Sequence, residues 1–160
     1  MTDSLSHYDS AGRARMVDVS RKPPTARTAR ASAFVRLSRK VLLALPSNPK
    51  GDPLEVARLA GIQAAKRTAD LIPLCHPLPL SHVDVDFKTR RDGIEITTSA
   101  RTTGPTGVEM EALTAAAVAA LTIYDMTKAL DKAITIESLQ LVEKTGGKSG
   151  HFLRPETPRK

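Results

Sequence analysis

The sequence predicts an α+β fold, a ferredoxin-like two-layer sandwich in which an antiparallel sheet carries its helices on one face. Two observations carry this prediction. Residues 25–37 and a hairpin around residues 83–98 have strand periodicity, while residues 108–130 form one long helical stretch before a β-branched run begins at residue 134. The order of strand, helices, two strands, helix and strand is the split β-α-β pattern.

The first strand and the helix after it follow from local patterns. Residues 25–37 alternate between two faces, and Ser38 can cap a short helix over residues 39–45 that Pro46 ends. One face of the strand carries Arg27, Ala29, Ala31, Ala33, Val35 and Leu37.

A second helix has a strong start signal. Asp52 supplies a cap, Pro53 stands at the first helical position, and Glu55 follows three residues after the cap. We expect this helix to run to about residue 69, slightly weakened by Gly61. The stretch LIPLCHPLPL then contains three prolines in ten residues, which predicts a rigid, extended connector.

The hairpin and the long helix complete the pattern. Residues 83–88 alternate apolar and polar side chains, an Asp92-Gly93 turn follows, and residues 94–98 alternate back. The long helix carries seven alanines over residues 111–130, on more sides than one sheet can cover. We therefore expect an oligomer with this helix near the contact.

Length and composition limit the class of protein. A chain of 160 residues is expected to be one domain, here residues 25–150, with a flexible basic arm over residues 1–24 and a flexible tail over residues 151–160. The single cysteine, Cys75, excludes an internal disulfide framework and fits a reducing cytoplasm. The most apolar helical stretch is too short to span a bilayer, so we expect a cytoplasmic protein.

The net charge of +7 lies entirely in the N-terminal part. Residues 1–50 hold 10 Lys and Arg against 3 Asp and Glu, whereas residues 51–160 hold 14 of each class. Such a segment could attract nucleic acid or a small polyanion. Single-strand readers stack bases on aromatic side chains, and this chain has no Trp, two Tyr and three Phe. The composition favours a phosphorylated small molecule, with duplex backbone binding still open.

The stretch KTGGKSG, residues 144–150, is not a phosphate-binding P-loop. The motif needs a glycine where Val142 stands and a helix on its far side, which Pro155 and Pro158 prevent. What remains is a loop with three glycines, a hydroxyl and two lysines. It could meet a phosphate or simply be solvated.

Several polar side chains could do chemistry, and each also has an ordinary interpretation. Asp125 and Lys128 share a helix face, so the acid could hold the lysine cationic, or the two could be a surface ion pair. Glu109 and Glu111 stand where carboxylates suit the helix dipole. His76 could be a positioned acid, base or phosphate donor, or a structural histidine.

The cysteine and the histidine do not form a recognisable centre. Cys75 and His76 are adjacent on an extended segment, so their side chains point to opposite sides and cannot easily form a thiolate-imidazole dyad. No second cluster with metal-ligand spacing accompanies them, so no metal site is expected.

Five stretches together are specific, and they cover nearly the whole chain from residue 16 to residue 150. They resemble the molybdenum cofactor biosynthesis protein C family, the cyclic pyranopterin monophosphate synthases. The stretches are MVDVS (16–20), KGD (50–52), ARLAGIQAAKRTADLIPLCHPLPLSHVDVDF (57–87), TGVEMEALTAAAVAALTIYDMTKAL (106–130) and KTGGKSG (144–150).

The resemblance implies a lyase that converts 3′,8-cyclo-7,8-dihydroguanosine 5′-triphosphate into cyclic pyranopterin monophosphate with release of pyrophosphate. It implies a ferredoxin-like fold and a hexamer of three dimers, with the pocket at a dimer interface. We expect a small-molecule triphosphate as partner, no membrane and no specific nucleic acid. No cofactor is expected, and Mg²⁺ accompanying the triphosphate stays open.

The resemblance also assigns site residues. It implies catalytic roles for Asp125, Lys128 and Lys50, and we hypothesise that Lys50 and Lys128 of one site come from different chains. A lysine held by a carboxylate can transfer protons if its pKa is tuned toward neutrality, and KTGGKSG is expected to be a mobile loop that closes over the triphosphate. The implied substrate contacts are Leu74, Cys75, His76, Met110 and Glu111, with Arg27, Lys144 and Lys148 around the phosphates.

The competing class is a non-catalytic binding module, for instance a regulator that binds RNA or nucleotides through the basic arm. It would explain the charge of +7. It leaves Asp125, Lys128 and the LCHP segment without a role.

Overall fold

The computed structural model describes residues 7–9 and 11–155, so the remaining parts of the predicted arm and tail lie outside the described residues. The elements follow the predicted order. They are β1 (Thr25–Arg36), α1 (Arg39–Ala44), a 3-10 turn (Leu45–Ser47), α2 (Pro53–Lys66), α3 (Thr68–Leu71), β2 (Leu80–Arg90), β3 (Gly93–Gly104), α4 (Glu109–Thr127), β4 (Thr135–Thr145) and β5 (Phe152–Leu153).

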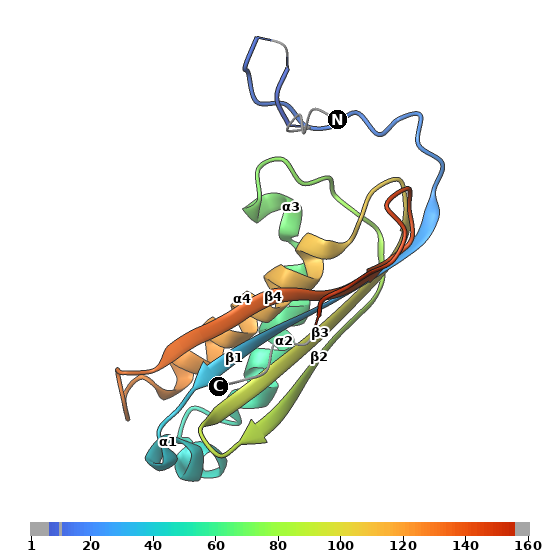
Figure 1. The fold of residues 1–160 in the computed structure, drawn as a ribbon. Helices are drawn as coiled ribbons and strands as arrows, with labels where there is room; N and C mark the ends of the chain where they lie inside the picture. The colour runs from blue at the N-terminus through green and yellow to red at the C-terminus, as the bar shows by residue number, and fades with distance from the viewer. Residues whose placement is uncertain (1–6, 10, 156–160) are drawn as a thin grey trace.

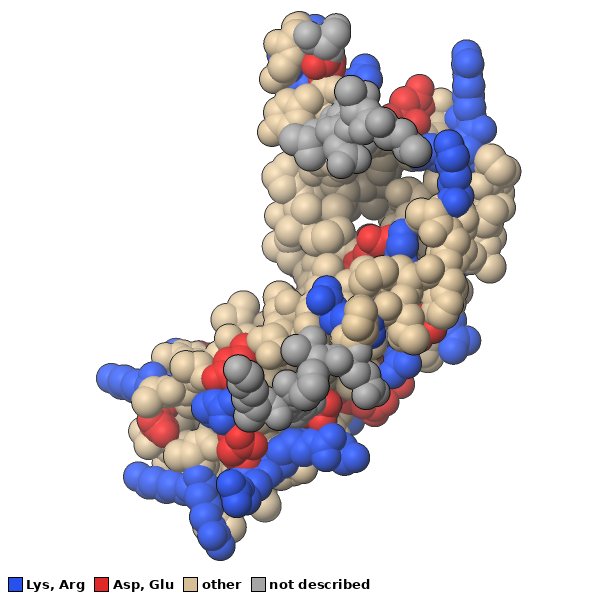
Figure 2. All heavy atoms as spheres, viewed as in Figure 1, with Lys and Arg blue, Asp and Glu red and all other residues tan. Residues whose placement is uncertain are grey.

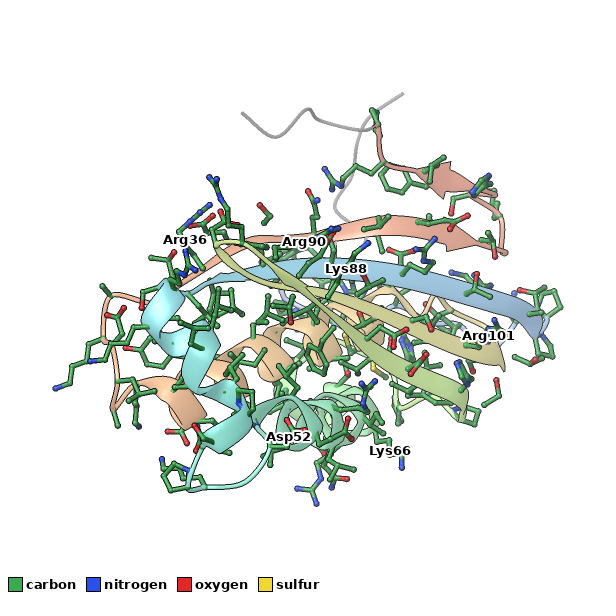
Figure 3. All side chains as sticks on the ribbon, turned by 90° about the horizontal axis from the view of Figure 1, so that it is seen from below. Arg36, Asp52, Lys66, Lys88, Arg90 and Arg101 are labelled. Atoms are coloured by element: carbon green, nitrogen blue, oxygen red, sulfur yellow. The ribbon has the colours of Figure 1, made fainter. Side chains whose placement is uncertain are left out.

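One antiparallel sheet carries the helical layer on one face. The strand order is β2-β3-β1-β4-β5, so β1 is central and pairs with β3 and with β4. The long helices α2 and α4 lie side by side under the sheet (Figure 1). In Figure 3 the labels Asp52 and Lys66 mark the helical layer, and Lys88 and Arg90 mark the sheet. The predicted α+β sandwich is confirmed, with the short β5 added at one edge.

The core is built from small side chains that let the two layers approach closely. Ala29, Ala31 and Ala33 of β1 are buried, as the alternation of the sequence predicts, and so are five alanines of α4. A Cβ added at Gly61 of α2 would lie 3.0 Å from the backbone oxygen of Ala115. Gly61 therefore serves close packing of α2 against α4 rather than merely weakening its helix.

Helix α2 begins as predicted but ends earlier. The side chain of Asp52 accepts hydrogen bonds from the backbone of Leu54 and Glu55 at 2.9 and 3.4 Å, which confirms the cap. Arg67 leaves the helical region, at φ −113° and ψ 16°, and its N–H bonds to the carbonyls of Ala64 and Ala65. The predicted helix to residue 69 is therefore divided into α2 and α3.

Arg36 links three segments of the chain by ion pairs, at the end of the sheet away from the start of α4. Arg36 of β1 pairs with Asp92 in the β2–β3 turn at 2.6 Å and with Glu137 of β4 at 2.8 Å. The hydrogen bond from Arg36 lowers the pKa of Glu137 to about 2.

Within the described residues, no helix is long and apolar enough to cross a membrane.

Candidate active site

Helix α4 carries predicted site residues at both of its ends. Asp125 and Lys128 stand at its C-terminal end, and Met110 and Glu111 in its first turn. At 1.5 Å per residue, the 14 positions between Glu111 and Asp125 correspond to about 21 Å. The predicted residues therefore fall into two groups, which we call the Asp125 cluster and the Glu111 cluster. The first contains Lys50, Asp125 and Lys128, and the second contains Cys75, Glu109, Glu111 and Lys144.

In the Asp125 cluster a carboxylate holds a lysine in its charged form. The Nζ of Lys128 lies 2.6 Å from Oδ1 of Asp125 one helical turn away, and both side chains are more than half exposed. The hydrogen bond from Lys128, followed by the charges of Lys128 and Lys50, lowers the pKa of Asp125. The same hydrogen bond raises the pKa of Lys128, away from neutrality. In this arrangement Lys128 is a cation, and the pKa tuned toward neutrality that proton transfer favours is not present.

Lys50 belongs to the same cluster within one chain. Asn48 links the turn that contains Lys50 to the end of α4. Its Nδ2 donates to the carbonyl of Met126 at 2.9 Å, and its Oδ1 accepts from the backbone N–H of Lys50 at 2.9 Å. The hypothesis that Lys50 and Lys128 of one site come from different chains is therefore wrong. Sequence reasoning missed Asn48, although its place in the SNPKG turn was a signal.

The Glu111 cluster contains a buried carboxylate without a partner. Glu111 is 4% exposed, and among the described residues its Oε2 has no hydrogen-bond partner. Burial, followed by the charge of Glu109, raises the pKa of Glu111. Burial and then the charge of Glu111 raise the pKa of Cys75, which keeps its sulfur a thiol. A buried acceptor left open in this way is suited to a ligand that brings a hydrogen-bond donor.

The glycine-rich loop after β4 is folded back on itself. The Nζ of Lys144 lies 3.1 Å from Oε1 of Glu109 and donates to Oγ of Ser149 at 2.6 Å. The N–H of Gly150 bonds to the carbonyl of Gly147 at 3.2 Å, and Lys148 is exposed. The interpretation of Glu109 as dipole compensation therefore misses its ion pair with Lys144.

The guanidinium group of Arg27 donates two hydrogen bonds to backbone carbonyls. Its Nε donates to the carbonyl of Gly104 at 3.0 Å, and its Nη2 to that of Pro105 at 3.2 Å. A Cβ at Gly147 would lie 2.1 Å from Nη1 of Arg27, so the glycine lets the loop rest against the arginine. Arg27 thus joins the turn before α4 to the glycine loop.

The remaining predicted contacts lie around the Glu111 cluster. Leu74 and His76 flank Cys75 and are half-buried, as is Met110 beside Glu111. The Nε2 of His76 is 2.8 Å from the carbonyl oxygen of Val17 in the N-terminal arm. Within residues 7–9 and 11–155, no group of three or more His, Cys, Asp or Glu could hold a metal ion.

Comparisons with known proteins identify the family of this chain. The model of the MoaC family matches residues 16–147, which include ten of the eleven predicted site residues, all but Lys148. The chain belongs to the MoaC family. A relative in Novosphingobium aromaticivorans is 60% identical over 156 residues, covering 96% of this chain and 99% of its own, and one in Deinococcus radiodurans is 57% identical over 96% and 92%. Both relatives are named cyclic pyranopterin monophosphate synthase.

The buried carboxylate of this MoaC-family chain should reduce its stability. Because the folded-state pKa of Glu111 lies above its ordinary value of 4.5, ionisation opposes folding increasingly as the pH rises above that value. We expect Glu111→Gln to stabilise the protein at pH 7 by about 1 kcal/mol, roughly 2–4 °C in Tm. Thermal unfolding at pH 7 and pH 4 tests this, because the gain should vanish at pH 4. An equal gain at both pH values would mean that charge burial is not its cause.

Proposed function

We propose that this chain is a lyase, a cyclic pyranopterin monophosphate synthase of molybdenum cofactor biosynthesis. It would convert 3′,8-cyclo-7,8-dihydroguanosine 5′-triphosphate into cyclic pyranopterin monophosphate and pyrophosphate. The observation that carries this proposal is 60% identity, over 96% of this chain, to a relative named for that activity.

The chemistry of the two clusters supports the proposal. A guanine-derived ring carries N–H groups, and the open Oε2 of Glu111 can accept a hydrogen bond from one of them. Closing the cyclic phosphate forms a bond from a ribose hydroxyl oxygen to the α-phosphorus and breaks the bond to the β-phosphate, so pyrophosphate leaves with growing negative charge. Lys144 and Lys148 are suited to stabilise that charge. Lys128, held cationic by Asp125, can donate a proton during ring opening.

The distance between the clusters supports an assembly in which two chains share each site. Groups that act on one substrate must reach it within hydrogen-bond distance, about 3 Å. The two clusters of one chain stand about 21 Å apart along α4, so one ligand meets both only if a partner supplies the second. We therefore propose that the Asp125 cluster of one chain meets the Glu111 cluster of its partner, within a hexamer of three dimers.

We also propose which ions the enzyme needs, in which compartment it works and which partner it could bind instead. We propose that the enzyme has no resident metal or cofactor and that Mg²⁺ would enter only with the triphosphate. We propose a cytoplasmic enzyme, because a single cysteine allows no internal disulfide and so suits a reducing compartment. A regulator that binds nucleic acid is the second candidate, favoured only by the charge of residues 1–50.

Mass spectrometry of the products tests the function directly. Incubation with the cyclised dihydro-GTP should yield cyclic pyranopterin monophosphate and one equivalent of pyrophosphate. No product together with submicromolar, sequence-selective binding of nucleic acid near physiological salt would overturn the enzyme in favour of the regulator.

Mixed oligomers test the shared site. We expect Lys128→Ala chains refolded together with Lys144→Ala chains to regain activity, measured at substrate far below KM. In a mixed dimer one site inherits both defects and the other neither, so random pairing restores roughly a quarter of all sites.

The matched control mixes Lys50→Ala with Lys128→Ala chains. Both changes lie in the Asp125 cluster, so each site of a mixed dimer keeps one defect and no activity should return. If neither mixture recovers while mass measurements confirm mixed dimers, each site is built from one chain.

A further inference from the structure

The N-terminal arm includes a segment that lies against the body of the protein. Residues 16–20 alternate in exposure, with Met16, Asp18 and Ser20 exposed and Val17 and Val19 half-buried. Alternation of this kind means that one side of an extended segment faces the protein and the other faces solvent. The carbonyl of Val17 also meets Nε2 of His76 at 2.8 Å. The segment, which we call the arm strand, thus touches the LCHP connector next to the Glu111 cluster.

Local hydrogen bonds give the arm strand a defined end. Oδ1 of Asp18 accepts from the backbone N–H of Ser20 at 2.9 Å and from its hydroxyl at 2.5 Å. The N–H of Lys22 then bonds to the carbonyl of Val19 at 3.0 Å, which makes a turn. A segment closed by such a turn has fewer alternative conformations, so little free energy is needed to keep it docked.

Positive charge flanks the arm strand on both sides along the chain. Residues 13–22 contain four cationic side chains and one carboxylate. Figure 2 shows the arm standing over the body, with an opening between them in which both acidic and basic atoms are visible. Cations placed over such an opening raise the local concentration of a polyanionic ligand.

The contact with Val17 determines which nitrogen of the His76 ring carries a hydrogen. A carbonyl oxygen can only accept, so Nε2 of His76 must carry the hydrogen of this bond. The nitrogen that points at the arm is therefore a donor to backbone. A glutamine can place an N–H at about the position of Nε2, whereas an asparagine reaches only as far as Nδ1.

We propose that the arm strand, residues 16–20, forms one wall of the substrate site, and that His76 is the positioning residue that docks it through Val17. The ligand class is a polyanion such as a nucleoside triphosphate, and this part rests on the proposed function. Undocking removes the wall, together with the cations that flank it, from the site without disturbing the sheet or α4.

Limited trypsin digestion of the whole protein measures docking without reference to activity. Arg15 and Arg21 flank the arm strand, and cleavage after either is identified by the mass of the remaining chain. We expect His76→Ala and His76→Asn to be cleaved there at least about fivefold faster than the wild type. His76→Gln, which keeps the donor, should be cleaved at nearly the wild-type rate.

Steady-state kinetics of the same variants tests the link to the site. We expect kcat/KM for the cyclised dihydro-GTP to fall at least about tenfold in His76→Asn and His76→Ala, mainly through KM. His76→Gln should lose clearly less of its kcat/KM than His76→Asn. Rescue by glutamine is the informative result, because a purely chemical role of the imidazole would not survive it.

Every other outcome overturns part or all of the proposal. Unchanged cleavage in His76→Ala would show that His76 does not dock the arm strand. Faster cleavage with unchanged kcat/KM would show that the arm strand is no part of the site. Loss of activity in His76→Gln with a protected arm would assign His76 to the substrate itself. If the wild type makes no product, the proposed function fails while the digestion result still decides docking.

Discussion

Lys128→Ala should lower kcat/KM by about 10²- to 10⁴-fold, the range that a positioned proton donor contributes. Asp125 holds this lysine at 2.6 Å and raises its pKa, so the wild-type side chain is a cation at neutral pH. Alanine removes both the proton and the charge. The variant should stay folded, since the side chain is half exposed at the end of α4. Kinetics together with circular dichroism decides the prediction.

Two further variants separate the functions of Lys128. Lys128→Arg keeps the charge but cannot give up a proton, because guanidinium groups stay protonated. Activity near that of the wild type in Lys128→Arg would reduce the role of Lys128 to electrostatics. Lys132→Ala removes an exposed lysine beyond the end of α4 and should leave kcat/KM unchanged. If Lys132→Ala were as damaging as Lys128→Ala, net charge would explain the loss.

Gly93→Ala should damage the fold strongly although it adds only one methyl group. A Cβ there would lie 2.2 Å from the carbonyl oxygen of Val35 and 2.7 Å from the ring of Phe34. Neither the paired β1 backbone nor the ring beside it can give way easily, so we expect a loss of about 2–3 kcal/mol. Thermal unfolding should show Tm lowered by roughly 4–12 °C.

Gly104→Ala is the matched control for this change. Gly93 and Gly104 are the first and last residues of β3, and both are buried. A Cβ at Gly104 would meet Leu78 and Thr102 at 3.6 Å, an ordinary contact. Its Tm should change by no more than a few degrees. Equal losses in the two variants would point to glycine conformation, rather than lack of space, as the reason for Gly93.

Much of the fold could be predicted because its signals are local. The alternation of residues 25–37, the cap at Asp52 and the long alanine-rich helix each determine one element, and the elements allow few arrangements. The hairpin was predicted correctly, but its turn is formed by Arg91 and Asp92 rather than by Asp92 and Gly93, because β3 already begins at Gly93. An Asp-Gly pair usually marks a positive φ, whereas Gly93 is not among the glycines with positive φ and is needed for space.

The grouping of the site residues could not be predicted, because it depends on contacts between distant segments. Nothing in the sequence shows that Asn48 bridges to Met126, or that Lys144 pairs with Glu109. The hypothesis about Lys50 failed for that reason. The pKa of Lys128 also depends on the exposure of its ion pair, and exposure follows from packing rather than from spacing along α4.

The folded-back glycine loop has a thermodynamic consequence. The Lys144–Ser149 bond, the Gly150–Gly147 bond and the pairing of β5 with β4 hold residues 144–150 in one conformation. The conformational entropy of this segment is therefore lost when the chain folds, and little remains to be lost on binding. An anion that meets this loop should associate with a smaller entropic penalty and a faster rate than one that must order the segment itself.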